Sequence, residues 1–449
     1  MASAAEQLFA NLNLDAFRKA DELKRRLWFT LGALLVYRLG TYVPLPGIDA
    51  LQLANLFKNA SSGILGMFNM FSGGAIERMA IFGLGIMPYI STSIIMQLLT
   101  SVVPQLEALK KEGEAGRKKI NQYTRYGTVV LAALQAYGVA VGLEGSNLAV
   151  DPGWFFRATT VITLVGGTIF LMWLGEQITS RGVGNGISLI IFAGIAADMP
   201  RAIANLMTLS SNGTINPLVG PAVLVVGIAL IALIVYFERA QRRLLVQYPK
   251  RQVGNRMFQG DASHLPLKLN TSGVIPPIFA SSLLLLPVTF AQFSAGQGQS
   301  SYDWLNTLNA MMQRGSLLHI LLYVGLIAFF CFFYTAVVFN TKETADNLKK
   351  YGGFLPGIRP GERTAQHLDY VLTRITVLGA AYLAFVCVLP ELFSADMGIP
   401  VYLGGTSLLI AVSVTMDTIA QVQSHLLAHQ YEGLIKKSRL KGSSIGRRP

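Results

Sequence analysis

The sequence is poor in charged residues. Only 14% of its 449 residues are charged, whereas a soluble globular domain has about 25%. Hydrophobic residues make up 52% of the chain, and its mean hydropathy is +0.46. A chain this apolar could not cover a water-exposed surface with polar groups. The composition excludes an ordinary water-soluble enzyme or a nucleic-acid-binding domain and identifies a polytopic membrane protein.

Motifs for catalysis and metal binding are also lacking. The only two cysteines, Cys331 and Cys387, lie in apolar stretches, so we expect both to be buried as small hydrophobic side chains. His425 and His429 are four residues apart but stand beside a basic tail, which makes metal binding a poor explanation. No P-loop, HExxH or Gly-x-Ser-x-Gly motif is present. We therefore predict that the protein is not an enzyme and uses no cofactor or metal ion.

What the sequence does contain is a series of long apolar stretches. A helix needs about 20 mainly apolar residues to cross a bilayer. Ten stretches meet this requirement, at 27–43, 78–101, 126–143, 157–175, 185–206, 217–237, 272–292, 315–339, 371–390 and 401–425. The fifth is interrupted by Asp198, Pro200 and Arg201. An even number of spans places both termini on one side, and the segment 1–26 has the pattern of an amphipathic surface helix.

The basic residues indicate which side is cytoplasmic. Most of the 37 Lys and Arg residues fall in the N-terminal segment, in alternate connections between spans and in the tail at 426–449. The positive-inside rule makes this side cytoplasmic. Two connections there, 238–270 and 340–369, are long and contain aromatic residues and turns, which favours docking of an acidic or nucleic-acid-bearing partner. A purely topogenic role of their charges is the alternative.

The tract between the first two spans is too apolar for a solvated loop. Its middle, Ile64–Phe71, has the pattern of a short amphipathic helix that ends at Gly73 and Gly74. Two turns of helix cannot cross a bilayer, and irregular backbone at membrane depth is tolerated only inside protein or beside water. We therefore predict that the tract re-enters the protein from the outer face. An interfacial helix on the outer leaflet is the alternative.

Ionisable residues are scarce within the spans. Asp417 is the only deep carboxylate, while Glu176, Glu238 and Arg374 lie at span ends, where solvation is the ordinary explanation. Arg38 lies toward the outer end of the first span, from where its side chain could reach the membrane surface. Ion-coupled transporters usually place ionisable residues near the bilayer midplane. The scarcity therefore argues against a specific polar transport site.

Prolines suggest an internal repeat. Pro88 and Pro276 interrupt the second and the seventh span, which are the second helices of two five-span halves, 27–206 and 207–425. Broken helices at corresponding positions are typical of inverted repeats in membrane proteins. We therefore predict two pseudo-symmetric halves.

Several strings along the chain resemble the bacterial SecY family. They are MFNMFSGGA, FGLGIMPYISTSIIMQLL, KKEGEAGRKKINQYTRYGT, FLMWLGEQITSRGVGNGIS, ASHLPLKLN, FFYTAVVFNTKETADNLKKYGGFLPGIRPGERTA and GGTSLLIAVSVTMDTIAQVQ. The similarity covers most of the chain, and the strings are long enough to be specific. The chain departs from the family in a short connection between the third and fourth spans, in Pro277 beside Pro276, and in the final GSSIGRRP, which leaves the role of the tail open.

The resemblance implies a protein-conducting channel. Its fold would be all-α, with ten transmembrane helices in two pseudo-symmetric five-helix halves and a short re-entrant plug helix at about 61–74. Unfolded polypeptides would cross the bacterial inner membrane through the centre, and transmembrane segments would leave sideways into lipid between the second and seventh spans. The implied partners are the SecE and SecG subunits, the SecA motor, the ribosome, signal peptides, nascent chains, membrane lipids and accessory Sec membrane proteins. A partner ATPase or the ribosome would drive translocation, and both termini would be cytoplasmic.

The resemblance also implies roles for individual residues. The pore would be narrowest at a ring of Ile86, Ile90, Ile187, Ile191, Ile278 and Ile410. The plug would contain Ile64, Leu65, Met67, Phe68, Met70 and Phe71. The lateral gate would contain Ser91, Thr92, Ser93, Gln97, Ser272 and Pro276. The motor and the ribosome would dock on Arg242, Arg243, Lys250, Arg251, Arg256 and Arg359.

Two other classes of protein stay open on the residues alone. A secondary solute transporter with inverted repeats is the main alternative, but it requires a midplane site with charge partners, which the sequence lacks. A membrane scaffold for ribosomes or lipids would explain the basic loops but not the re-entrant tract. Each isoleucine of the ring, taken by itself, could equally be ordinary core packing.

Overall fold

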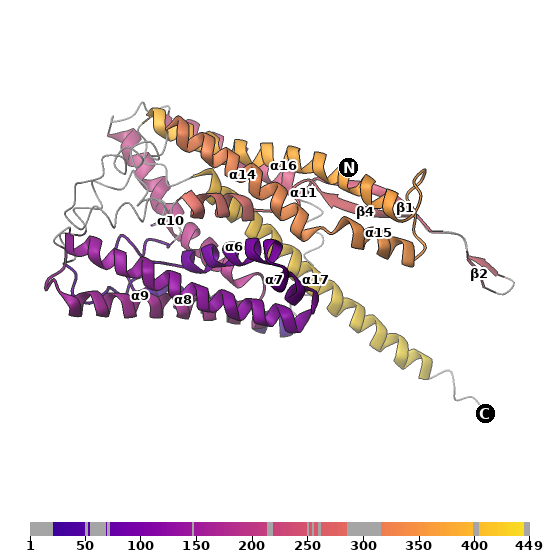
Figure 1. The fold of residues 1–449 in the computed structure, drawn as a ribbon, viewed down its shortest axis with the longest axis horizontal. Coiled ribbons are helices and arrows are strands. Elements are labelled where there is room, and N and C mark those ends of the chain that lie inside the picture. The colour runs from indigo at the N-terminus through magenta and orange to yellow at the C-terminus, as the bar shows by residue number, and fades with distance from the viewer. Residues whose placement is uncertain are drawn as a thin grey trace.

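The computed structural model describes residues 21–49, 53, 69, 72–145, 148–212, 219–248, 251–253, 256–258, 262–284, 316–397 and 404–443. Most of these residues are helical (Figure 1). The longer helices are α3 (Asp21–Gly40), α6 (Met87–Val102), α7 (Pro104–Lys111), α8 (Glu114–Gly145), α9 (Trp154–Arg181), α10 (Gly186–Ser211), α11 (Val219–Arg239), α14 (Leu317–Val338), α15 (Thr341–Lys350), α16 (Glu362–Met397) and α17 (Gly405–Ser443). A shorter apolar helix covers Ile275–Leu284. The strands are β1 (Gln241–Gln247), β2 (Arg251–Val253), β3 (Arg256–Phe258) and β4 (Ala262–Lys268).

The prediction of a helical polytopic membrane protein is confirmed. Each of the ten predicted spans overlaps one of these helices. Within the described ranges, α8, α9, α10, α11, α14, α16 and α17 are long and apolar enough to cross a membrane. Their outward faces carry large apolar side chains such as Ile228 and Leu321, which are 68% and 61% exposed. Such a surface suits a lipid environment.

The second span begins later than the sequence suggested. We predicted a start at residue 78, but α6 begins at Met87, and residues 72–86 form turns and a bridge instead. Met79 and Gly85 have φ angles of 42° and 57°, which a right-handed helix does not accept. Pro88 lies in the first turn of α6, where no intrahelical N–H donor is needed.

The fifth span is less interrupted than expected. The helix α10 continues through Pro200 and ends at Ser211, well beyond the predicted end at 206. Neighbouring groups in a membrane protein can satisfy the carbonyl that a proline leaves without its helical donor. The cluster of Asp198, Pro200 and Arg201 is therefore part of a helix that faces the connections at its outer end.

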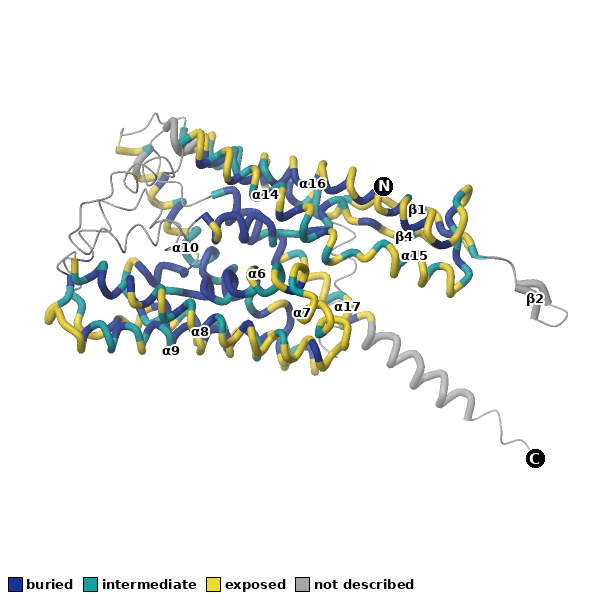
Figure 2. The backbone as a smooth tube through the Cα atoms, viewed as in Figure 1, coloured by how far each residue is buried: buried dark blue, intermediate teal, exposed yellow. Residues whose placement is uncertain are grey.

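The helices form two groups along the long axis of the molecule. The first group consists of α3, α6, α8, α9 and α10, and the second of α11, the Ile275–Leu284 helix, α14, α16 and α17. α8 and α9 lie along one side and α14 and α16 along the other, with α6 and α10 between them (Figure 1). The helix α17 contacts α3 and α10 as well as α11 and α16. Buried residues are concentrated between the groups, where one hydrophobic core joins both (Figure 2).

We predicted a loop at the basic segment 238–270 of an all-α chain, but this segment contains the four β-strands. β1 and β4 form an antiparallel ladder from Gln241 opposite Lys268 to Gln247 opposite Ala262, and β2 pairs with β3. Gln247 also exchanges two backbone hydrogen bonds of 2.9 Å with Phe354. The two basic segments, 238–270 and 340–369, are thus joined at the end of the molecule where α15 lies (Figure 1).

Candidate functional site

All six isoleucines predicted for the pore ring lie in or against one hydrophobic cluster. The cluster includes Ile86 and Ile90 from α6 and its cap, Ile191 from α10, Ile278 from the short helix and Ile410 from α17, with Ile187 packed against it. Segments far apart in the sequence therefore meet in one central core. Aliphatic side chains cannot replace the hydrogen bonds that water loses in a narrow passage. Their role as a ring around such a passage stays a prediction.

Among the described residues, two of the contact zones between the helix groups differ in kind. We call the contact of α6 with the Ile275–Leu284 helix the front seam. Across it, Ser282 Oγ lies 3.8 Å from Met87 Sδ, a weak contact because a thioether sulfur is a poor acceptor. Both helices also contribute apolar side chains to the central cluster, among them Ile90 of α6 and Phe279 of the short helix.

The back seam lies where α3, α10 and residues 182–185 meet α17. Here the backbone N–H of Gly184 donates to Gln421 Oε1 at 2.9 Å, and that of Val183 donates to Thr30 Oγ1 at 3.1 Å. Leu23, Val183 and Leu426 form a small apolar cluster beside these bonds. The connection between α9 and α10 is therefore held by helices of both groups.

The predicted gate residues lie on α6 and around the start of the short helix. Ser91 and Thr92 are buried on α6, Ser93 and Gln97 are half-buried, and Ser272 and Pro276 are buried at the start of the short helix. The methyl group of Thr92 packs against Gly127 of α8, which differs from its expected orientation toward the span at 272–292. The hydroxyl of Ser272 donates to Asn270 Oδ1 at 3.1 Å and lies 3.7 Å from Cys331 Sγ of α14. Gate function stays a prediction for the six.

Two polar contacts near these helices were missed at the sequence level. Glu238, treated as a solvated residue, accepts a hydrogen bond of 2.8 Å from Asn270 Nδ2. Glu176 forms two hydrogen bonds, of 2.9 and 2.8 Å, with the guanidinium of Arg125, which ties α9 to α8. A carboxylate at the end of an apolar span was the only available signal. It does not identify the partner, because the partner comes from another segment of the chain.

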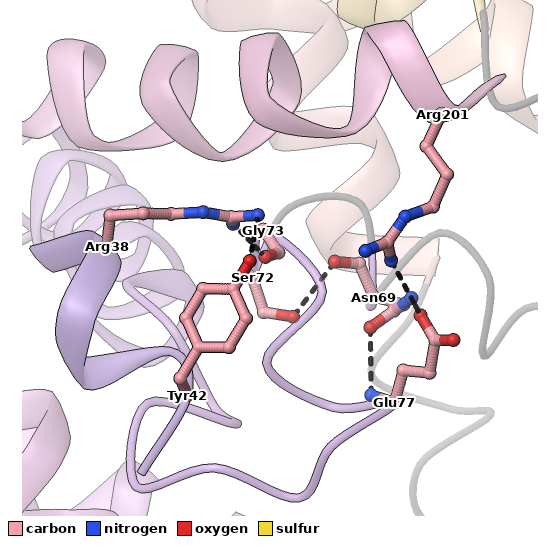
Figure 3. A network of polar contacts seen from close by, with 7 residues as sticks. All are labelled: Arg38, Tyr42, Asn69, Ser72, Gly73, Glu77 and Arg201. Carbon is pink, nitrogen blue, oxygen red and sulfur yellow. Dashed lines mark hydrogen bonds and ion pairs between the residues drawn. The ribbon is translucent and has the colours of Figure 1, made fainter. Parts of the chain in front are cut away.

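The plug prediction falls largely outside the described residues. Ile64, Leu65, Met67, Phe68, Met70 and Phe71 all lie there, and their arrangement stays a prediction. The structure does describe the end of this tract, Asn69 and Ser72–Gly74, which contacts α3 and faces Glu77 and Arg201 (Figure 3). Arg38, which we expected to reach toward the membrane surface, donates instead to the carbonyl oxygen of Gly73.

The predicted docking residues gather at one end of the molecule. Arg242 and Arg243 are exposed on β1, and Arg359 is exposed in a turn between Gly357 and Gly361. Lys250 lies outside the described residues, and Arg251 and Arg256 are described only as the first backbone positions of β2 and β3. The paired backbone of Gln247 and Phe354 connects the two segments that carry these arginines.

The Arg359 turn has a defined conformation. Gly357 and Gly361 have φ angles of +82° and +106°, in the region that favours glycine. The hydroxyl of Thr364 donates to the Arg359 carbonyl oxygen at 3.0 Å. The turn therefore holds the backbone while leaving the guanidinium exposed. Both cysteines, in contrast, are buried and free, as predicted.

The fold and this site define a class: a polytopic helical membrane protein with an aliphatic centre between two helix groups and a basic face at one end. Comparison with known proteins gives the family. The SecY family model matches residues 80–419. The protein translocase subunits SecY of Escherichia coli K12 and of Vibrio cholerae are each 55% identical to this chain, covering 94% and 95% of it and 96% and 98% of their own lengths. The chain belongs to the SecY family.

Solved structures show the same fold at lower identity. One match is a SecY structure described for its plug domain, which stabilises the closed state of that channel and maintains a membrane seal. It matches with a TM-score of 0.68 at 18% identity, covering 91% of this chain and 93% of that one. A protein-conducting channel matches with a TM-score of 0.64 at 17% identity and the same coverage. The idle yeast Ssh1 complex bound to the 80S ribosome matches at 0.61 and 16% identity, over 88% of each chain.

Proposed function

We propose that this chain is the central channel subunit of a protein translocase, through which unfolded polypeptides cross the membrane. The observation that carries the proposal is the aliphatic cluster, in which isoleucines from α6, α10, the Ile275–Leu284 helix and α17 meet between two helix groups. A channel that passes many different sequences should offer no specific polar site at its centre. An aliphatic constriction can stay dry when narrow and yield around an extended chain.

Lateral release of transmembrane segments would occur through the front seam. This seam is linked by apolar packing and one weak hydroxyl–sulfur contact, between Ser282 and Met87. An apolar signal sequence, with a core of about 7–15 residues, could replace such packing with its own side chains. The halves at 27–206 and 207–425 would then separate at the front while the back seam keeps them together.

The energy for transport would come from partners. We propose that the SecA motor and the ribosome dock on the basic face that Arg242, Arg243 and Arg359 share, and that SecE and SecG accompany the chain in the bacterial inner membrane with both termini cytoplasmic. The ribosome carries phosphate groups, and exposed arginines are suited to bind them. Nascent chains, signal peptides, membrane lipids and accessory Sec membrane proteins would be the remaining partners.

Reconstitution tests the channel. The chain with its partner subunits is placed in lipid vesicles, and conductance is measured while a polypeptide is stalled in transit. We expect the stalled chain to open a conductance that closes after release. Saturable flux of a small solute without such conductance would instead support an inverted-repeat solute transporter, and the channel proposal would have to be given up.

The docking proposal is tested separately at Arg359. Reversing its charge in Arg359→Glu should block motor-driven translocation while the channel still folds and inserts, because the side chain is exposed in a turn that backbone contacts hold. Arg359→Lys should restore only part of the activity, since Lys lacks the planar five-donor group. Arg181→Glu, at the exposed C-terminal end of α9, is the control for charge reversal. Normal export by Arg359→Glu at native abundance would exclude docking through this residue.

A further inference from the structure

The end of the re-entrant tract is attached to the first span by two hydrogen bonds. Arg38 Nη1 donates to the carbonyl oxygen of Gly73 at 2.7 Å (Figure 3). Tyr37 Oη donates to the carbonyl oxygen of Ser72 at 3.2 Å. Tyr37 is only 1% exposed, and Arg38 is half-buried. The acceptors are adjacent backbone carbonyls. The contact therefore depends on backbone position and not on the side chains of residues 72 and 73.

The same segment is wedged against α10. Gly73 has a φ angle of +66°, and a Cβ atom at this position would lie 2.8 Å from Tyr37 Oη and 2.9 Å from the Cα atom of Gly194. The contact is also close when seen from Gly194. A Cβ atom added at Gly194 would lie 3.2 Å from the Cα atom of Gly73. Two glycines thus let the backbones of the tract and α10 touch. Any side chain at either position would force them apart.

Short-range contacts close the segment into a turn. Ser72 Oγ and the Gly74 N–H both donate to the carbonyl oxygen of Asn69, at 3.0 and 2.8 Å. The Asn69 side chain accepts a hydrogen bond of 2.9 Å from the Glu77 N–H. Asn69 and Ser72 are buried. The turn therefore forms one unit, and its attachment to α3 should slow its opening.

Arg38 is well suited to this contact. Besides the Gly73 carbonyl, its guanidinium contacts the Tyr42 hydroxyl at 3.3 Å, and its centre lies 5.1 Å from the Tyr42 ring. Asp198 of α10 adds an electrostatic interaction from the other side. A planar group with several fixed donors can serve all these partners at once, which a single ammonium cannot. Hydrogen bonds from a charged donor are also stronger than neutral ones.

We propose that Tyr37 and Arg38 are positioning residues that anchor the segment Ser72–Gly74 to the outer end of α3, against Gly194 of α10. We call this arrangement the outer anchor. The inference rests on the proposed function: the anchor fixes one end of the tract that seals the resting channel, so that the seal returns to the same place after each polypeptide has passed. Loss of the anchor should raise resting ion conductance without preventing translocation.

The test uses full-length chain with its partner subunits in lipid vesicles. Arg38→Met removes the charged donor and should raise resting conductance about tenfold, the ratio expected from one charge-assisted hydrogen bond. Tyr37→Phe removes one oxygen atom and should raise it about fivefold. Arg38→Lys should fall between Arg38→Met and the wild type. Arg157→Met is the matched control, since Arg157 is also at the outer end but pairs with Glu144 of α8.

Amide hydrogen exchange adds a readout that conductance alone does not give. The N–H groups of Gly74 and Glu77 are bonded within the turn, so their exchange should speed up in Arg38→Met and Tyr37→Phe but not in Arg157→Met. Wild-type conductance and exchange in both anchor variants would overturn the outer anchor, while normal polypeptide translocation would leave the proposed function standing. If the wild-type complex moves no polypeptide, the proposed function fails, and the sealing role of the anchor fails with it.

Discussion

The front and back seams join the same two helix groups by different means. At the front seam, the polar link that the described residues show between α6 and the short helix is a hydroxyl 3.8 Å from a thioether sulfur, and both helices contribute apolar side chains to the central cluster. At the back seam, the backbone N–H of Gly184 donates to Gln421 of α17 at 2.9 Å, and the neighbouring Val183 N–H donates to Thr30 of α3, in its own group, at 3.1 Å. Thus the front seam depends on packing, whereas a directed hydrogen bond crosses the back seam in addition to its apolar cluster.

This difference indicates which seam can open. Apolar packing is not directional, so another apolar surface can replace it with little loss of free energy. A buried N–H group that loses its acceptor has no such substitute, and leaving it unpaired costs about 1–3 kcal/mol. The back seam should therefore stay closed and act as the hinge, and the front seam should be the one that an inserting helix separates.

The largest effect should come from the aliphatic cluster in which the two seams meet. The fourfold variant that converts Ile86, Ile90, Ile191 and Ile278 to Ser should fold but conduct ions strongly in planar bilayers without substrate, because polar walls allow the passage to wet. Ordinary core positions behave differently, since truncating one buried isoleucine in a packed core costs about 2–5 kcal/mol.

The fourfold variant therefore separates two interpretations. A protein that unfolds, or one that resists ion flow as well as the wild type, would mean that these isoleucines pack a core, and the pore assignment would have to be abandoned. Leu164 of α9, which is buried in a separate cluster, is a suitable control position: its conversion to Ser should reduce stability without opening a conductance.

The next largest effect is expected on the free energy of unfolding when the back seam is changed. Gly184 has a φ angle of +91°, and a Cβ atom there would lie 2.8 Å from Leu189 Cδ1. We expect Gly184→Ala to lower the free energy of unfolding by about 1–3 kcal/mol through backbone strain, and Gln421→Leu to lower it by about 1–3 kcal/mol by leaving the Gly184 N–H unpaired. Thermal unfolding in detergent measures both.

The matched control lies at the front seam. Ser282→Ala removes only the weak contact with Met87 Sδ and should change the free energy of unfolding by no more than about 0.5 kcal/mol. If Ser282→Ala destabilises the protein as much as Gln421→Leu does, the two seams are equivalent and the assignment of hinge and gate loses its basis.

Much of the fold was predictable because each span must satisfy a length and hydropathy requirement on its own. The ten apolar stretches overlap the observed helices, but α8 begins at Glu114 and α17 ends at Ser443, far outside them. Lysines such as Lys118 and Lys119 favour helix, so a helix can continue beyond the bilayer. Hydropathy does not predict this polar part of the helix. The start of α6 at Met87 was missed because left-handed turns at Met79 and Gly85 leave no clear mark in hydropathy.

The site was predictable only in part, because its contacts join distant segments. The isoleucines could be named from the resemblance, but their meeting in one cluster required the fold. The pairing of Gln247 with Phe354 and the bond from Gly184 to Gln421 depend on geometry that no local pattern encodes. The role of Arg38 was misjudged because its partner is a backbone carbonyl, which every residue possesses.

The smallest effect on export is expected at Gln97 of α6, which we predicted for the lateral gate. Among the described residues its Oε1 atom is buried without a hydrogen-bond donor, and its Nε2 atom donates only a long bond of 3.4 Å to Ser93 Oγ. Gln97→Leu removes this unpaired group and adds apolar surface, so it should favour the closed seam by about 1 kcal/mol and reduce export of substrates with weakly hydrophobic signal sequences about fivefold. Substrates with strongly hydrophobic signal sequences should be exported normally, because their binding outweighs so small a change.

Gln105→Leu on the exposed face of α7 is the matched control. If Gln97→Leu exports substrates with weakly hydrophobic signal sequences as well as the wild type or better, the Gln97 side chain does not oppose closure of the seam. Gln97 would then not belong to the front seam.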